Sequence, residues 1–249
     1  MKYLLLLASL FLVIGCGQNG KSQQKEKASR TPLSYEVHQE GALMNFMHKG
    51  DLSSKINLAT LSPENLYALG AVENLKGEIL VLNGNALISR VRQKEVQIDE
   101  SLENEAALLV YAHVEKWLEV GNTKSFESGG QFEKWLDSEA KKTGIDTSKP
   151  FPFLLKGKVS SLSWHVIDWP EGDTEHTHQK HVNSGLNGDL QETEVSVLGF
   201  HSKNHKGVFT HHSSNVHMHM STTDYELAGH VDEFNPGSEM TLFLPATKN

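Results

Sequence analysis

The feature that most constrains the fold of this chain is the segment 215–220, which reads NVHMHM. Side chains alternate between the two faces of a β-strand, so His217 and His219 would project from one face, about 7 Å apart along the backbone. The intervening methionines would then point the other way, into apolar packing. His230 lies eleven residues beyond His219. On a neighbouring strand it would complete a face of three imidazole nitrogens with an open position, the layout of a catalytic zinc site.

The distribution of histidine supports a metal site in the second half of the chain. Of 14 histidines, eleven lie between His165 and His230. Three imidazoles suit zinc, although copper, nickel and iron are chemically compatible, so another divalent transition metal stays open. The alternative is that His217 and His219 lie on a solvent-facing strand and that His230 is unrelated. The loop 173–181 carries three more histidines and is expected to be an exposed polar loop, with a second metal or an extension of the site as alternatives.

Composition describes a soluble domain of ordinary hydrophobicity. The chain has 249 residues, of which 38% are hydrophobic and 22% charged, enough for one large domain or two small ones. Its formal net charge is −8 with the histidines neutral. This charge disfavours nucleic acid or an anionic membrane surface as a partner.

The N-terminus has the pattern of an export signal. Residues 1–15 combine Lys2 with the apolar run 3–14, and Cys16 follows Gly15 as in a bacterial lipobox. We therefore predict a lipoprotein signal peptide over 1–15, lipid modification of Cys16 and a disordered tether over 16–31. The protein would be exported and anchored through its lipid on the periplasmic or cell-surface side of a membrane. An ordinary signal peptide that happens to contain a cysteine is the alternative.

Helices are expected at three places in the first half of the folded part. Residues 35–47 have apolar side chains at helical spacing. Ser62 and Pro63 form a helix start, with Ser62 as the cap, and open a short helix over 64–69. Residues 126–142 form the third helix.

Strands account for most of the remaining sequence. Residues 71–88 are expected as strands with turns at Lys76-Gly77 and Asn83-Gly84, and 106–120 fits either a strand followed by a loop or one helix. Residues 171–190 are expected to be a loop. The strands expected after residue 152 are 153–159, 162–167, 194–200, 216–221, 229–234 and 240–244.

This arrangement predicts an α+β fold that is mainly β. We expect two packed mixed-sheet halves with a few helices, the first over 32–148 and the second, β-rich and carrying the metal site, over 149–249. Cys16 is the only cysteine in the sequence, so neither an intramolecular disulfide nor a cysteine zinc ligand is expected.

Five segments, in the same order and with compatible spacing, resemble the acetolactate decarboxylase family. They span roughly residues 66–245. The segments are ALGAVENLKGEILVLNG at 68–84, KGKVSS at 156–161, VLGFHS at 197–202, HMHM at 217–220 and GHVDEF at 229–234.

The resemblance implies a metal-dependent α+β enzyme that converts 2-acetolactate, a 2-hydroxy-3-keto acid, to acetoin and carbon dioxide. The family's three zinc-binding histidines correspond to His217, His219 and His230, and an active-site glutamate corresponds to Glu78. An ordinary Gly-Glu pair after a turn is the alternative for Glu78. The resemblance implies a small-molecule substrate and leaves a homodimer open.

Two departures from the family concern the residues that handle substrate. His165 stands where the family's substrate-binding arginine is expected, and no arginine follows Arg92. A histidine does not replace the bidentate guanidinium clamp on a carboxylate. A second family glutamate, expected shortly after Leu244-Pro245, has no counterpart. The scaffold and the metal site are thus expected to be preserved, with altered substrate contacts.

The expected function is decarboxylation with zinc as the Lewis acid and with Glu78 or His165 as the group that protonates the enediolate product. Two alternatives stay open. One is a zinc-dependent ester hydrolase on the same scaffold, and the other is a non-catalytic metal-binding lipoprotein. The sequence contains neither a phosphate-binding glycine-rich loop nor a Gly-x-Ser-x-Gly nucleophile motif.

Overall fold

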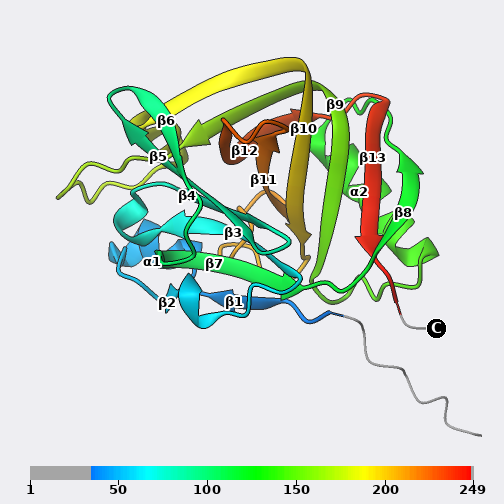
Figure 1. The fold of residues 1–249 in the computed structure, drawn as a ribbon, viewed down its shortest axis with the longest axis horizontal. Helices are drawn as coiled ribbons and strands as arrows, with labels where there is room; N and C mark the ends of the chain where they lie inside the picture. The colour runs from blue at the N-terminus through cyan, green and yellow to red at the C-terminus, as the bar shows by residue number, and fades with distance from the viewer. Residues whose placement is uncertain (1–34, 248–249) are drawn as a thin grey trace, which may run out of the picture. The chain divides into compact units, whose positions relative to one another are not determined.

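Two antiparallel β-sheets pack against each other in the computed structural model, which describes residues 35–247. The predicted signal peptide, Cys16 and the tether lie outside the described residues. The first sheet has the strand order β1-β7-β3-β4-β5-β6, with β2 paired to β7 (Figure 1). Its strands are β1 (His38–Glu40), β2 (Ile56–Asn57), β3 (Leu66–Val72), β4 (Glu78–Leu82), β5 (Asn85–Arg92), β6 (Glu95–Asp99) and β7 (Glu105–His113).

The second sheet closes on itself and thereby fixes the position of the histidine strands. Its order is β10-β11-β12-β9-β13-β8, and β10 also pairs with β9, so β9, β10, β11 and β12 form a closed circuit. The predicted neighbourhood of the strands that carry His217, His219 and His230 is therefore observed. The strands are β8 (Trp117–Asn122), β9 (Phe151–Val166), β10 (Leu186–His201), β11 (Val216–Thr222), β12 (Ala228–Asn235) and β13 (Glu239–Pro245).

The helices are few and short. They are α1 (Leu43–Lys49), α2 (Gly129–Lys142), α3 (His178–Ser184) and two 3₁₀ turns, Leu58–Thr60 and Glu73–Leu75. The predicted mainly β, α+β class is confirmed, although paired strands within residues 35–247 all run antiparallel and not in mixed sheets. Among the same residues, no helix has the length and hydropathy to span a membrane.

The helix predicted over 64–69 is wrong, because this segment enters the central strand β3. Each residue of β3 is buried, and the strand lies between β4 and β7. A strand covered on both faces reads as a continuous apolar run, which hides the two-residue period. Gly70 allows close approach to β7, since a Cβ there would lie 2.0 Å from the Leu108 carbonyl oxygen. Tertiary packing therefore overrides the local helix signal of Ser62 and Pro63.

Other expectations are confirmed or corrected as follows. The helix expected over 35–47 is observed only as α1, after the short strand β1, and 106–120 forms the strands β7 and β8. The helix over 126–142 is confirmed as α2, where the Ser128 side chain caps the N-terminus. The loop expected over 171–190 contains α3 and the start of β10. The turn at Asn83-Gly84 is confirmed, with φ of 52° and 81°.

The two faces of the first sheet bury different clusters. Leu80 and Leu108 belong to the larger cluster, which also holds Phe132 of α2 and Phe153 of β9. Ile79 belongs to a smaller cluster on the other face of the first sheet. Because residues two apart in a strand share a face, Glu78 points with Leu80 toward the second sheet. Strand alternation thus directs one carboxyl group into the space between the sheets.

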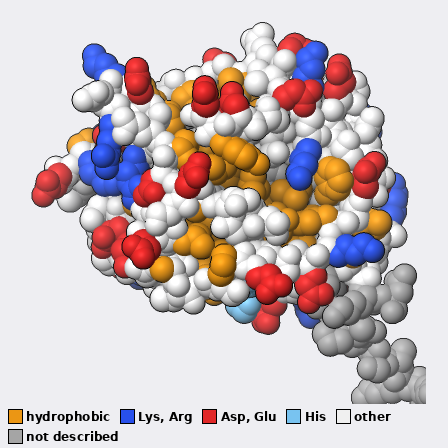
Figure 2. All heavy atoms as spheres, in the orientation of Figure 1, with side chains coloured by type: hydrophobic (Ala, Val, Ile, Leu, Met, Phe, Trp, Pro, Cys, Tyr) orange, Lys and Arg blue, Asp and Glu red, His pale blue; other side chains and the backbone are white. Residues whose placement is uncertain are grey.

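On the face of the molecule in Figure 2, apolar side chains form a band across the middle. Acidic and basic side chains are interspersed around it. The strongly exposed large apolar residues of the described chain are Met44, Met47, Leu118 and Tyr225.

His201 is a core histidine at the end of β10. It is 1% exposed, and its ring stacks on Phe151 with the centroids 4.7 Å apart. Burial lowers the pKa of His201 from 6.5 to about 4; Asp137 and Glu133 of α2 oppose this lowering, while Lys203 and Lys141 add to it. The folded protein therefore holds this imidazole neutral.

We expect this histidine to make the fold sensitive to acid. Below pH 6.5 the His201 imidazole binds a proton in the unfolded chain, whereas in the folded chain it does so only near pH 4. The unfolded state therefore binds more protons in this range, and stability is lost as the pH falls. Between about pH 7 and pH 5 the free energy of unfolding should fall by about 2 kcal/mol more in the wild type than in His201→Phe. Urea unfolding at both pH values measures this difference. Equal losses in the two proteins would contradict the assignment.

Candidate metal and proton-transfer centre

Three histidines converge where β11 and β12 pair. His219 and His230 are direct cross-strand partners, and His217 lies two residues before His219 on the same face. The Nε2 atoms of His217 and His219 lie 3.2 Å apart. Two nitrogens bound to one tetrahedral zinc lie about 3.3 Å apart, since each Zn–N bond is about 2.0–2.1 Å. With His230, each residue offers a ligand atom within 4.8 Å of the others, so the three side chains fit a zinc ion.

Burial keeps the imidazoles of His217 and His219 in the form that binds metal. His217 is 8% exposed and His219 is fully buried. Burial lowers the pKa of both well below 6.5, and the neighbouring histidines lower it further. Backbone groups of Phe209 and Ile79 near the two rings partly oppose this lowering of the pKa. Neither group has the full geometry of a hydrogen bond to the Nδ1 atoms of His217 and His219. Neutral imidazole is the metal-binding form, because a proton on the ligand nitrogen competes with the metal.

Glu78 reaches this site from the opposite sheet. Its Oε2 lies 3.7 Å from Nε2 of His219, and its Oε1 lies 3.7 Å from Nε2 of His165. The Ile167 N–H donates a hydrogen bond to Oε1 at 3.4 Å. Burial raises the pKa of Glu78 well above its usual value; the Ile167 N–H opposes the rise and the charge of Asp232 adds to it. Glu78 is therefore a buried carboxyl group placed between two imidazoles.

His165 extends the histidine row to a third strand. It is the cross-strand partner of His230, with ring centroids 4.7 Å apart, so His219, His230 and His165 stand side by side on β11, β12 and β9. Its Nδ1 atom lies 2.9 and 2.8 Å from the two carboxylate oxygens of Asp232. Burial lowers the pKa of His165, and the hydrogen bond to Asp232 opposes that effect. The structure thus gathers all five site residues that the sequence analysis placed here, Glu78, His165, His217, His219 and His230.

Asp232 is a site residue that the sequence analysis missed. Its Oδ1 lies 3.4 Å from Nδ1 of His230 and 3.9 Å from Nε2 of His178. Burial alone would raise its pKa, but the hydrogen bond from His165 and the nearby imidazole of His230 hold it well below its usual value. His165, His230 and Asp232 form a second group whose ligand atoms lie within 4.8 Å of one another. The signal in the sequence was its spacing of two residues from His230, which puts both on one strand face.

The histidine-rich segment 173–181 makes its own contacts, apart from His217, His219 and His230. His176 stacks on Trp169 with centroids 4.4 Å apart, and its Nδ1 lies 3.0 Å from Nε2 of His181. Lys180 pairs with Asp173 at 2.9 Å. From this segment, His178 approaches the site, with its Nε2 atom 3.9 Å from Oδ1 of Asp232. His176 is the one buried residue of 173–181, so the predicted exposed polar loop is observed in large part, and it leads into α3 beside the site.

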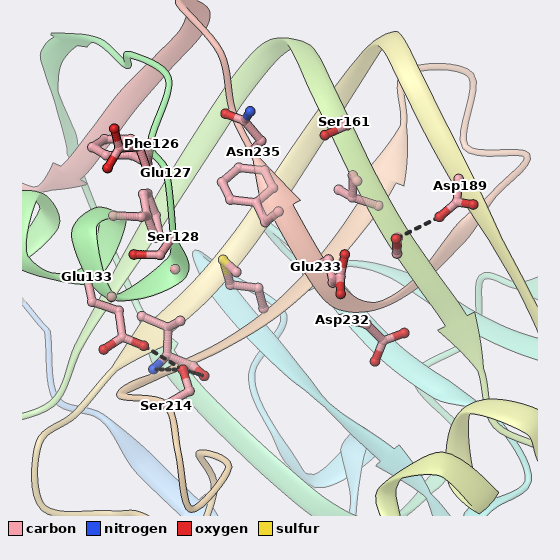
Figure 3. Close-up of a pocket in the computed structure, with 18 of the residues that line it drawn as sticks. Phe126, Glu127, Ser128, Glu133, Ser161, Asp189, Ser214, Asp232, Glu233 and Asn235 are labelled. Atoms are coloured by element: carbon pink, nitrogen blue, oxygen red, sulfur yellow. Dashed lines mark hydrogen bonds between the residues drawn. The ribbon is translucent and has the colours of Figure 1, made fainter.

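A cavity of about 770 Å³ has Asp232 in its wall, whereas Glu78, His165, His217, His219 and His230 do not line it. Figure 3 shows Asp232 and Glu233 of β12 on one side of it, with Asp189 of β10 nearby and Glu133 of α2 farther along. The Ser163 hydroxyl donates a hydrogen bond of 2.6 Å to Asp189. A smaller cavity of about 380 Å³ also has Asp232 in its wall, together with His178. The lining of the larger cavity is rich in carboxylates and hydroxyls.

Comparison with known proteins points to one family. The sequence model of the alpha-acetolactate decarboxylase family matches residues 37–248. Comparison with curated protein sequences gave no significant match.

The solved structures most relevant to the fold belong to the same group. Alpha-acetolactate decarboxylase from Bacillus subtilis strain 168 is 13% identical, covers 86% of each chain and has a TM-score of 0.65. The enzyme from Bacillus subtilis subspecies spizizenii is also 13% identical, with 86% of this chain and 87% of that one covered and a TM-score of 0.66. A Staphylococcus aureus protein of unknown function, described as similar to alpha-acetolactate decarboxylase, is 14% identical over 84% of this chain and 85% of that one, with a TM-score of 0.63. At these identities the likeness establishes the fold.

Proposed function

Because the chain belongs to the alpha-acetolactate decarboxylase family, we propose that it is a zinc-dependent decarboxylase that converts 2-acetolactate to acetoin and carbon dioxide. The observation that carries this proposal is the convergence of His217, His219 and His230, with two Nε2 atoms 3.2 Å apart, opposite Glu78. We also propose that the protein is exported and anchored to a membrane through a lipid on Cys16.

The three histidines would hold zinc, which as a Lewis acid would stabilise the negative charge that develops while carbon dioxide leaves. The chain's own groups then have to return a proton to the carbon that lost the carboxylate. Glu78 and His165 both face this space, with Oε1 and Nε2 3.7 Å apart. We assign proton delivery to Glu78, because His165 directs its Nδ1 to Asp232 and is held neutral by burial. His165 would accept or relay the proton at Nε2.

One observation favours a second candidate function, zinc-dependent ester hydrolysis. At the family's arginine position, His165 is paired with the carboxylate of Asp232, and the adjoining cavity is lined by Glu127, Glu133 and Asp189. These carboxylates would repel an anionic substrate more than a neutral ester. In that reaction Glu78 would take a proton from the attacking water.

Turnover assays on the full-length chain, purified in detergent with zinc added, separate these functions. We expect acetoin and carbon dioxide to form from racemic 2-acetolactate, and we expect chelation followed by zinc addition to remove and restore the activity. Hydrolysis of 4-nitrophenyl acetate without acetoin formation would favour the esterase. Bound zinc with neither activity would contradict both enzymatic functions and favour the metal-binding lipoprotein.

A further inference from the structure

We infer that Asp232 is a positioning residue that orients two imidazoles with different tasks, His230 as a metal ligand and His165 as a proton carrier. This inference rests on the proposed function for the tasks of the two histidines. The orientation itself follows from contacts among described residues and can be measured without turnover.

The contact with His165 fixes which nitrogen of that ring carries the proton. Both carboxylate oxygens lie within 2.9 Å of Nδ1, and an ionised carboxylate can only accept a hydrogen bond. Nδ1 is therefore the protonated nitrogen of His165, and Nε2 keeps its lone pair. That lone pair is directed to the side of Glu78, whose Oε1 lies 3.7 Å away. A carboxylate behind an imidazole sets its tautomer and its orientation in this way.

The contact with His230 serves the metal site. Nδ1 of His230 lies 3.4 Å from Oδ1 of Asp232, so the other ring nitrogen, Nε2, is left for the metal. Metal-bound histidines commonly donate their second N–H to a carboxylate, which orients the ring and makes it a stronger ligand. This contact is looser than that of His165, because the His230 Nδ1 lacks hydrogen-bond geometry here, and the ring of His230 is 25% exposed. An external tether is therefore more important for this ligand than for the fully buried His219.

The backbone places Asp232 where it can reach both rings. The register between β12 and β9 shifts between Val231 and Glu233, so Asp232 is the extra residue of a β-bulge. Bulges re-aim side chains and are common beside active sites. Asp232 thus shares a face with His230, while His165 comes from the adjacent strand. Its side chain is 12% exposed, and within residues 35–247 the imidazoles of His165, His178 and His230 lie within 4.0 Å of its carboxylate oxygens.

Burying a carboxylate costs free energy unless the hydrogen bonds it accepts compensate. An asparagine would fit the same space, but its amide has a single acceptor oxygen in place of two. The ionised side chain faces the Nδ1 of His165 with both oxygens and lies 3.4 Å from the Nδ1 of His230 with one of them. We therefore expect the charge of Asp232, and not its volume alone, to matter.

The test compares Asp232→Asn with Asp189→Asn in the full-length protein. Asp189 lines the same cavity and binds the Ser163 hydroxyl, so it controls for removal of one cavity charge. Asp232→Asn should lower zinc affinity by about 10–100-fold, measured by competition with a chromophoric chelator. Long-range ¹H–¹⁵N NMR should find His165 protonated at Nδ1 in the wild type and a changed tautomer population in Asp232→Asn. Asp189→Asn should match the wild type in both measurements.

Turnover adds a third measurement. If 2-acetolactate is the substrate, Asp232→Asn should lower kcat at saturating zinc by about 10²-fold or more with little change in KM. Failure of the wild type to turn over would contradict the proposed function only, because affinity and tautomer still test Asp232. Unchanged zinc affinity and an unchanged His165 tautomer in Asp232→Asn would overturn the inference. Two zinc ions per wild-type chain, falling to one in Asp232→Asn, would also overturn it, since Asp232 would then be a ligand.

Discussion

Replacing His219 by alanine should leave the folded protein without bound zinc and without metal-dependent activity. His219 is the cross-strand partner of His230, and its Nε2 faces that of His217 at 3.2 Å, so it adjoins both of the other histidines of the proposed site. Losing a group that only orients a metal-bound histidine typically costs 10–100-fold in affinity. Loss of a ligand itself should exceed that, and we expect metal affinity to fall by more than about 100-fold.

The measurement is zinc content after dialysis against a zinc-buffered solution, with circular dichroism to monitor the fold. His201→Ala is the matched control, because it removes an equally buried imidazole, 1% exposed, from the neighbouring strand. The control should keep about one zinc per chain, whereas His219→Ala and His217→Ala should retain less than about a tenth of one. Full zinc content in both site variants would show that the metal binds elsewhere.

Much of the candidate site could be predicted because its chemistry follows strand alternation. The spacing of His217 and His219 fixes one face whatever the rest of the fold is, and His230 needed only a neighbouring strand. The active-site role of Glu78 was predicted only from resemblance to a family, since no local pattern separates it from an ordinary glutamate after a turn. Alternation within β4 then explains why it points between the sheets.

The pairing of Asp232 with His165 could not be predicted, because the two residues are remote in sequence. His165 is 67 residues away, and the two meet only through the register of β12 on β9, which a bulge shifts. A one-residue change of register would turn the side chain to the other face. Sequence patterns predict strands in this region, but they do not specify which residues of the two strands are paired. The same lack of tertiary information explains the error at β3, where burial on both faces decides against the helix signal at Ser62 and Pro63.

Replacing Glu78 by glutamine should separate the chemistry from metal binding. Glutamine has nearly the same shape but cannot deliver or accept a proton, so kcat should fall by about 10²–10⁴-fold at saturating zinc. Zinc content should stay at about one per chain, because the three histidines are untouched. Glu73→Gln is the control: it changes a carboxylate five residues away that accepts a hydrogen bond from the Ser54 N–H, and it should leave kcat unchanged.

The stability of the same variant tests why a carboxyl group is buried at this position. Glu78 is 5% exposed, and within residues 35–247 its carboxyl group accepts one hydrogen bond, of 3.4 Å from the Ile167 N–H. Its desolvation therefore has little compensation within the fold. A neutral amide avoids that cost. The free energy of unfolding of zinc-free Glu78→Gln should therefore be at least that of the wild type, and up to about 1 kcal/mol higher. A variant that loses turnover while gaining stability would identify Glu78 as a group retained for chemistry. Loss of stability together with zinc would instead mean that Glu78 supports the metal site.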